Sequence, residues 1–153
     1  MLEKQSKAPA FTLMDQQGKL VSLSDFEDQT IVLYFYPKDD TPGCTTQACS
    51  YRDHSDEFKK RNVEVIGVSK DDVKSHARFR DKYNLNFTLL SDPDLNVIPR
   101  YHVWVEKNRF GKKYMGIART TFVIRNGIIE EIFENVSPKN DVEQVLAALD
   151  KLN

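Results

Sequence analysis

The segment Thr30–Tyr36 constrains the fold of this chain more than any other part of its sequence. It is a continuous run of β-branched and aromatic residues that shows no alternation between apolar and polar positions. This pattern is typical of a strand that is buried on both faces of a sheet. Pro37 ends the run, and a helical pattern with apolar residues three and four apart begins near Cys44. The chain therefore contains a buried strand that leads into a helix.

The segments that follow continue the alternation of strand and helix patterns. Val63–Val68 has the pattern of a second buried strand, and Ser69–Asp72 predicts a capping box that opens a helix toward Tyr83. Thr88–Leu90 is a short candidate strand, and Asp94–Tyr101 has room for one or two helical turns. This alternation is typical of an α/β protein.

Two β-hairpins are predicted, one near each end of the chain. Ala10–Leu13 and Leu20–Leu23 flank a glycine-containing turn. Thr120–Ile124 and Ile128–Phe133 flank an Asn-Gly pair, which readily adopts the positive φ angles of a type I′ turn. The chain therefore carries antiparallel strands as well as buried ones.

The last predicted helix begins with Ser137 as its cap and Pro138 in its first position. Its apolar stripe is formed by Val142, Val145, Leu146, Leu149 and Leu152. Together these elements predict an α/β, thioredoxin-like fold with a mixed central sheet, helices on both faces and an N-terminal β-hairpin. A length of 153 residues suits one domain, so we expect a single thioredoxin-like domain over residues 1–153.

Charge and hydropathy exclude several classes of partner. Twenty-two Lys and Arg residues against 23 Asp and Glu residues leave a net charge of −1, too little to hold nucleic acid or an anionic membrane nonspecifically. The longest apolar run, Ile31–Tyr36, is far shorter than the roughly 20 residues of a membrane-spanning helix. No apolar block of signal-peptide length follows Met1–Lys7, so we expect a cytoplasmic protein.

Chemistry is concentrated in Pro37–Cys44, which joins the buried strand to the helix, where open α/β sheets usually bind ligands. If Thr41 is the N-cap, Pro42 takes the first helical position and Cys44 the third. The free N–H groups and the helix dipole favour an anion there, so a thiolate at Cys44 is stabilised. This placement favours a nucleophilic cysteine over a small buried hydrophobic residue.

Cys49 follows Cys44 at a spacing that an intact helix cannot bridge. Their Cα atoms would stand about 8.6 Å apart, with side chains roughly 140° apart around the helix. A disulfide needs Cα atoms within about 7 Å, so a Cys44–Cys49 disulfide requires the first turns to unwind. Cys49 shares its helix face with Asp53, Asp56 and Lys60, and we expect it to be accessible to solvent when the helix opens.

Other cysteine chemistries fit this sequence less well. His54 lies ten residues beyond Cys44 on the same helix, roughly 15 Å away, which is too far for the base of a cysteine hydrolase. His76 and His102 have no spacing that ties them to the thiols or that suggests paired zinc ligands. A thioredoxin-type centre would carry Cys-x-x-Cys, whereas four residues separate the cysteines here.

These residues resemble a known family. Pro37-x-x-x-Thr41-x-x-Cys44 is similar to the peroxidatic-cysteine motif of the peroxiredoxins, and Cys44-Thr-Thr-Gln-Ala-Cys49 resembles their bacterioferritin-comigratory-protein (Q-type) branch. The resemblance extends downstream through Trp104–Lys107, Gly111–Ile117 and Arg119–Phe122.

The resemblance implies a thiol peroxidase that reduces hydrogen peroxide and organic hydroperoxides. In that family the residue at Cys44 attacks the peroxide and becomes a sulfenic acid, Thr41 hydrogen-bonds the thiolate and peroxide, and Pro37 shields the site from water. Arg119 should lie opposite the helix start and stabilise the thiolate and the developing charge. Cys49 would condense with the sulfenic acid, giving an intramolecular disulfide for thioredoxin or a similar dithiol to reduce.

The resemblance also implies a monomer without metal, haem or flavin. Gln47 stands where several other peroxiredoxin branches carry Glu, which agrees with the Q-type branch. Two alternatives remain open. One is a protein disulfide reductase on the same fold, and the other is a nonenzymatic redox sensor or holdase in which Cys44–Cys49 oxidation exposes a binding surface.

Overall fold

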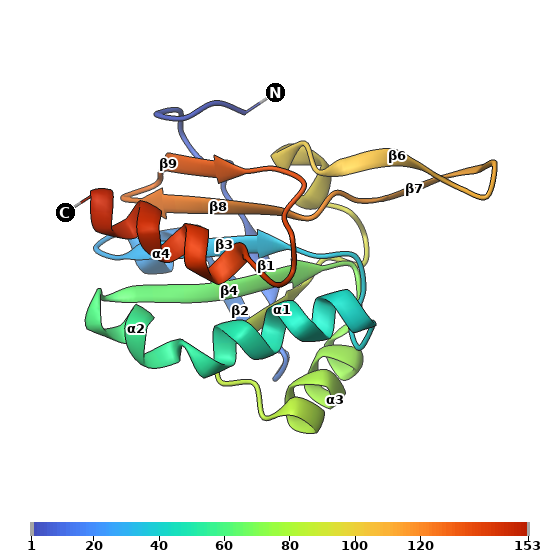
Figure 1. Cartoon of the computed structure of the whole chain (residues 1–153), viewed down its shortest axis with the longest axis horizontal. Coiled ribbons are helices and arrows are strands. Elements are labelled where there is room, and N and C mark those ends of the chain that lie inside the picture. Colours follow the sequence, from blue (N-terminus) through green and yellow to red (C-terminus); the bar gives the residue numbers. More distant parts are fainter. Residues whose placement is uncertain (1, 153) are drawn as a thin grey trace.

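A seven-stranded mixed sheet forms the centre of the structure, a computed structural model that describes residues 2–152 (Figure 1). Its strands are β1 (Thr12–Met14), β2 (Leu20–Ser22), β3 (Thr30–Phe35), β4 (Val63–Ser69), β5 (Thr88–Ser91), β8 (Thr120–Arg125) and β9 (Ile128–Phe133). They are arranged in the order β2-β1-β5-β4-β3-β8-β9. Strands β3, β4 and β5 are parallel, whereas the other pairings are antiparallel. The predicted mixed sheet and N-terminal hairpin are confirmed.

The uninterrupted apolar run forms β3, which lies between β4 and β8. Val32 and Tyr34 point into the core on one face of the sheet, and Ile31, Leu33 and Phe35 point into the core on the other. Successive side chains of a strand alternate between faces, so a strand covered on both sides must be apolar throughout.

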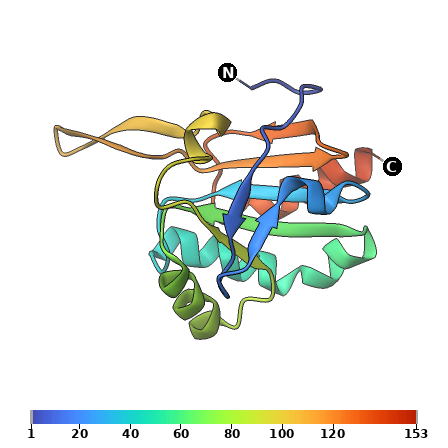
Figure 2. The same cartoon turned by 180° about the vertical axis from the view of Figure 1, so that it is seen from behind.

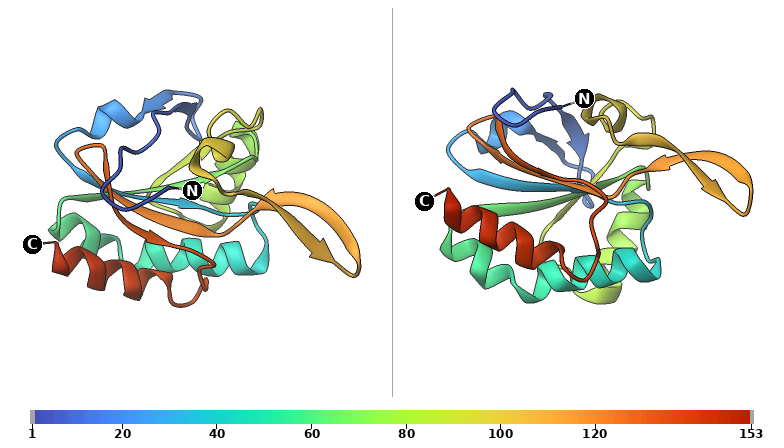
Figure 3. Two further views of the ribbon diagram at one scale, coloured as in Figure 1. Left: turned by 90° about the horizontal axis from the view of Figure 1, so that it is seen from above. Right: turned by 45° about the horizontal axis from the view of Figure 1, so that its top comes forward.

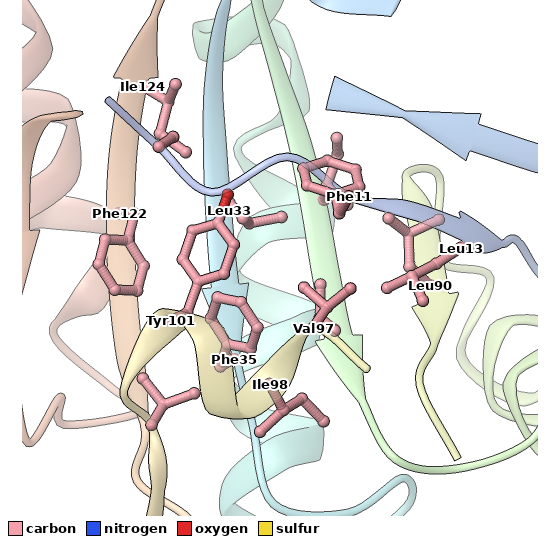
Figure 4. Packing of buried hydrophobic residues seen from close by; sticks show 14 of the residues in the cluster. Phe11, Leu13, Leu33, Phe35, Leu90, Val97, Ile98, Tyr101, Phe122 and Ile124 are labelled. Atoms are coloured by element: carbon pink, nitrogen blue, oxygen red, sulfur yellow. The ribbon is translucent and has the colours of Figure 1, made fainter. Parts of the chain in front are cut away.

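Within the described residues, six helical segments cover the sheet, namely η1 (Leu23–Phe26), α1 (Pro42–Asp53), α2 (Ser55–Lys60), α3 (Val73–Tyr83), η2 (Ile98–Tyr101) and α4 (Asp141–Lys151). All four α-helices bury residues in the core on the Tyr34 side, and Figure 3 shows α1, α2 and α4 along one face. The N-terminal segment and the short 3-10 helices η1 and η2 cover the opposite core (Figures 2 and 4). Helical segments thus lie on both faces of the sheet, as predicted, but the α-helices all lie on the same face. No helix in the described part of the chain is long and apolar enough to cross a membrane.

The start of α3 differs from the prediction. Ser69 forms no capping box, because it completes β4 and pairs with Ser91 of β5. Asp72 caps the helix instead, and its carboxylate accepts a hydrogen bond from the Ser75 backbone N–H at 2.8 Å. The predicted capping box was therefore wrong.

The start of α4 also lies later than predicted. Its N-cap is Asn140 and its first residue is Asp141, so Ser137 and Pro138 precede the helix. The Ser137 carbonyl accepts hydrogen bonds from the backbone N–H groups of Asn140 and Asp141, both at 3.1 Å. A turn therefore follows Ser137, and it brings Asp141 to a buried position.

A second, two-stranded sheet consists of β6 (Trp104–Arg109) and β7 (Lys112–Ile117), which form a hairpin that extends from the body of the molecule (Figures 1 and 2). This hairpin was not predicted from the sequence, because its strands are largely exposed and lack a buried apolar face. Trp104 pairs with Ile117 at its base. From there the chain enters β8 through Arg119, so the hairpin stands beside the start of α1.

Candidate active site

The start of α1 has the arrangement expected from the sequence. Thr41 is the N-cap residue, Pro42 is the first helical residue and Cys44 is the third. The Cys44 side chain is 1% exposed and packs in the core between α1 and the sheet. The N–H groups of a first helical turn have no partners within the helix, and together with the helix dipole they favour a negative charge on Cys44 Sγ.

Arg119 places a cation beside this sulfur. It lies in the link between β7 and β8, and its Nη2 atom donates a hydrogen bond to Cys44 Sγ at 3.4 Å. A guanidinium is always charged in proteins, so this contact places a positive charge directly beside the sulfur. The two side chains are 75 residues apart in sequence, and the fold brings them together.

Gln47 orients Arg119 from the same helix. The Nη1 atom of Arg119 donates to Gln47 Oε1 at 2.7 Å, and Gln47 Nε2 donates to Asp141 Oδ2 at 2.9 Å. Only this orientation of the amide satisfies both neighbours, because a guanidinium can only donate and an ionised carboxylate can only accept. Gln47 is fully buried, so its amide links the two charged groups without water.

Asp141 is the buried end of the hydrogen-bond network that runs from Cys44 through Arg119 and Gln47. It is fully buried, and its Oδ2 atom also accepts hydrogen bonds from the hydroxyls of Tyr51 at 2.5 Å and Thr121 at 2.9 Å. Burial raises the pKa of the Tyr51 hydroxyl well above its usual range, and the charge of Asp141 raises it further, so Tyr51 remains a donor. The network therefore connects the start of α4 to the start of α1.

Sequence reasoning missed Asp141. An acidic residue in the first turn of an amphipathic helix is ordinarily a solvated partner of the helix dipole, and no local pattern marks it as buried. The available signal was Gln47, a polar residue on the helix face that carries Cys44, Ala48 and Tyr51. A polar side chain on a buried face requires a hydrogen-bonding partner.

Thr41 lies in the loop that precedes α1. Its hydroxyl donates a hydrogen bond to the Lys38 carbonyl at 2.9 Å and makes no capping bond to the helix. The hydroxyl proton is thus bound to Lys38, the expected hydrogen bond from Thr41 to Cys44 is not formed within the described residues, and the oxygen lone pairs are left as acceptors.

Pro37 lines a cavity of about 440 Å³ between this loop and the β6–β7 hairpin. Trp104 and Met115 contribute apolar walls, and Lys107 contributes a cation. Burial lowers the pKa of the Lys107 ammonium and the charge of Arg119 lowers it further, whereas negative charge on Cys44 acts in the opposite direction. Lys107 is thus a second cation in the surroundings of the sulfur, and sequence reasoning did not identify it.

Cys49 is a free thiol, half-buried, in the same unbroken helix as Cys44. Helical geometry keeps the two Cα atoms about 8.6 Å apart, which exceeds the limit of about 7 Å for a disulfide. The structure therefore shows the dithiol state, and a bond between these cysteines needs a different conformation of α1.

The three histidines contact other groups. His54 follows α1 and its Nδ1 atom lies 2.8 Å from a carbonyl of that helix, while His102 ends η2 and its backbone N–H donates to the Pro99 carbonyl at 3.0 Å. His76 is buried, with its Nδ1 atom 2.7 Å from Asp39 Oδ2. Within residues 2–152 no contact joins any of them to Cys44, which leaves a cysteine-hydrolase site without a base.

Known proteins resemble this chain over most of its length. Residues 5–132 match the model of the AhpC/TSA family. The chain is 50% identical over 149 residues to a putative peroxiredoxin Bcp from Coxiella burnetii, covering 97% of this chain and 99% of that protein. It is 49% identical over 140 residues to peroxiredoxin Bcp from Escherichia coli K12, covering 91% and 90%.

Solved structures are similar along nearly the whole chain. The bacterioferritin comigratory protein of Xanthomonas campestris, solved as a trapped intermediate and ligand complex, has a TM-score of 0.87 and 36% identity, covering 92% of this chain and 90% of that one. Peroxidoxin BcpB of Mycobacterium tuberculosis has a TM-score of 0.89 and 31% identity, covering 100% and 99%. These similarities confirm the predicted thioredoxin-like fold.

Proposed function

Because this chain belongs to the AhpC/TSA family and is a peroxiredoxin, an enzyme that reduces peroxides with electrons from a thiol reductant, we propose that Cys44 is its peroxidatic cysteine. The observation that carries this assignment is the position of Cys44 Sγ in the first turn of α1, with Arg119 Nη2 at 3.4 Å. Both the helix start and the guanidinium favour the thiolate, which is the reactive form of cysteine.

In the first step the Cys44 thiolate attacks one oxygen of the hydroperoxide ROOH. An S–O bond forms and the O–O bond breaks, giving Cys44 sulfenic acid and the anion RO⁻, which takes a proton to become ROH. Negative charge moves from sulfur to the leaving oxygen, and Arg119 is placed to stabilise it during the transfer. Thr41 offers an acceptor to the peroxide proton, and Pro37 covers the site from the loop side.

In the second step we assign Cys49 as the resolving cysteine. Its thiol condenses with the Cys44 sulfenic acid, forming an S–S bond and releasing water. The first turns of α1 must unwind for this reaction, which breaks the helical hydrogen bond from the Thr45 N–H to the Thr41 carbonyl, now 2.8 Å long. Thioredoxin or a similar dithiol then reduces the disulfide and allows α1 to rewind.

The proposed substrates are hydrogen peroxide and organic hydroperoxides. The similar Xanthomonas campestris protein has an alkyl peroxide reduction activity. In this chain the cavity beside Pro37 combines the apolar side chains of Trp104 and Met115, which can contact an organic substituent, with a charged remainder formed by Lys38, Lys70, Asp71, Lys107 and Arg109. We further propose that the enzyme acts as a monomer in the cytoplasm and without a bound cofactor.

A coupled assay tests this function. Oxidation of NADPH should be observed when wild-type protein is mixed with thioredoxin, thioredoxin reductase and hydrogen peroxide or cumene hydroperoxide. Activity that depends on peroxide supports the peroxidase. Reduction of insulin disulfides at the same rate without peroxide would instead support a disulfide reductase, and no turnover with any peroxide would refute the proposal.

The resolving role predicts a specific defect for Cys49→Ser. We expect this variant to reduce one equivalent of peroxide at nearly the wild-type rate, because Cys44 and Arg119 are unchanged. Its steady-state turnover with thioredoxin should be poor, because no intramolecular disulfide can form. The one-equivalent burst can be measured from residual peroxide after mixing without reductant, and the steady-state rate from NADPH absorbance; undiminished turnover would exclude Cys49 as the resolving residue.

Gly43 is predicted to be essential for the position of Arg119. A Cβ atom at Gly43 would lie 3.2 Å from Arg119 Nη2 and 3.4 Å from Pro138 Cγ. Gly43→Ala should therefore displace the guanidinium and lower the second-order rate constant with peroxide about tenfold, since small misplacements at reacting groups are costly.

A matched control for this substitution is Gly127→Ala in the turn between β8 and β9. Gly127 has a φ of 75°, so alanine strains the backbone there, but it touches no site residue. Stopped-flow oxidation should show a normal rate for this control. A normal rate for Gly43→Ala as well would mean that Arg119 tolerates the added methyl group.

A further inference from the structure

We propose that His76 is a positioning residue of the peroxidatic site, whose doubly protonated ring, bound between Asp39 and the Leu90 carbonyl, fixes the loop Pro37–Thr41 ahead of α1. The inference rests on the function proposed above for Cys44. It concerns a buried histidine that the chemistry of the two cysteines does not use.

Each ring nitrogen of His76 faces an oxygen atom. The side chain lies on α3 and is fully buried, with Nδ1 2.7 Å from Asp39 Oδ2 and Nε2 2.9 Å from the Leu90 carbonyl oxygen. The Leu90 carbonyl and an ionised Asp39 are both acceptors, whereas a neutral imidazole can donate from only one nitrogen; the Tyr36 hydroxyl lies farther from Nδ1, at 3.5 Å. Both hydrogen bonds form together when the ring carries two protons, and the charge of Asp39 then balances the imidazolium.

The surroundings of Asp39 favour its ionised form. The Tyr36 hydroxyl donates to Oδ1 at 2.5 Å and the Ser75 hydroxyl donates to Oδ2 at 2.8 Å. Burial raises the pKa of the Tyr36 hydroxyl well above its usual range, so it stays protonated and continues to donate. Several donors directed at one carboxylate stabilise its negative charge.

A bound cation is not needed to explain this cluster. Ligand atoms of Asp39, Asp71 and His76 lie within 4.8 Å of one another, a spacing that a cation could use. The Asp71 Oδ2 atom, however, accepts from the Ser69 hydroxyl at 2.7 Å and from the Asp39 backbone N–H at 2.8 Å. These hydrogen bonds account for the position of the Asp71 carboxylate without a cation.

Asp39 connects α3 to the loop that precedes the active-site helix α1. It lies midway between Pro37 and Thr41, and the adjoining Lys38 carbonyl accepts the hydrogen bond of the Thr41 hydroxyl at 2.9 Å. The next residue, Asp40, has a φ of 57° and is held by two further side chains of α3. The peptide between Lys38 and Asp39 thus connects the α3 histidine to the N-cap of the helix that carries the nucleophile.

The test uses a double-mutant cycle on the rate of Cys44 oxidation by hydrogen peroxide. His76→Gln keeps a donor but cannot carry the charge, and we expect it to lower the second-order rate constant about tenfold or more, because the loop shifts relative to the sulfur. Asp39→Asn should have a similar effect. The double variant should be about as slow as either single variant, because the pair acts as one unit.

A loss of stability alone must be distinguished from mispositioning. Ile129→Ala removes a fully buried side chain from the core on the opposite face of the sheet. At temperatures where all variants are folded, it should keep the rate within about twofold of wild type, because distant sites do not couple. A wild-type rate for His76→Gln, or losses that multiply in the double variant, would refute the positioning role.

Nitrogen NMR tests the charge in the unmodified protein. At neutral pH the His76 ring, assigned by comparison with His76→Gln, should show two protonated nitrogens, and one unprotonated nitrogen would overturn the proposal. This measurement does not depend on peroxide. If the wild-type protein consumed no peroxide, the function of Cys44 would be refuted, while the ring signal would still report on the His76–Asp39 pair.

Discussion

Cys44→Ser should abolish peroxide consumption. Serine fills almost the same volume in the buried position, but its hydroxyl does not ionise near neutral pH even beside Arg119, and the anion is the nucleophile. We therefore expect the loss to occur in the first chemical step and the fold to remain intact. Residual peroxide after mixing with stoichiometric protein measures this step directly, and circular dichroism verifies the fold.

Cys49→Ser is the matched control, because it makes the same atomic replacement in the same helix. It should still consume about one equivalent of peroxide, since each peroxidatic thiolate reacts once before it needs a resolving thiol. Peroxide consumption by Cys44→Ser together with an inert Cys49→Ser would reverse the assignment of the two sulfurs.

Asp141→Ala should cause the largest loss of stability among single substitutions in the site. It leaves the donors of Gln47, Tyr51 and Thr121 buried without their acceptor. Removing one partner of a buried, charged network typically costs about 3–5 kcal/mol. For a chain of this size that corresponds to a fall in Tm of about 10 °C, which differential scanning calorimetry can measure.

The same substitution should also slow Cys44 oxidation in the protein that remains folded, because Gln47 loses the group that orients it toward Arg119. Asp150→Ala on the same helix is the control. Asp150 is exposed and pairs with Arg61 at the surface, so its loss should change neither Tm nor rate measurably. A Tm for Asp141→Ala equal to that of this control would show that Asp141 does not anchor the network.

Much of the fold was accessible to sequence reasoning because hydrophobic patterning is local. The run Thr30–Tyr36 predicted β3, and the Asn-Gly pair predicted the turn between β8 and β9, where Asn126 has a φ of 52° and Gly127 one of 75°. Helix boundaries were less accessible. The pattern that starts near Cys44 continues through His54, but the structure divides it there into α1 and α2, and tertiary contacts decide such breaks.

The hairpin of β6 and β7 escaped prediction for a different reason. Its side chains are mostly exposed, and Phe110 at its tip is 94% exposed, so no buried face imposes an alternating pattern. A regular spacing of apolar residues appears where one face of a helix or strand is buried. An element that is mostly exposed therefore shows little regular spacing in its sequence. The contribution of Lys107 to the site could therefore be seen only in three dimensions.

Sequence alone determined that a cysteine stands in the first turn of a helix after a buried strand, and that its neighbour Cys49 cannot reach it while that helix is wound. Both conclusions depend on residues within one or two helical turns of each other, for which backbone geometry is nearly invariant. Tertiary structure decided what surrounds the sulfur. Arg119 is 75 residues from Cys44, Asp141 is 94 from Gln47 and His76 is 37 from Asp39. Such contacts arise from the packing of strands and helices against one another, and the burial that makes them strong is a property of the whole fold.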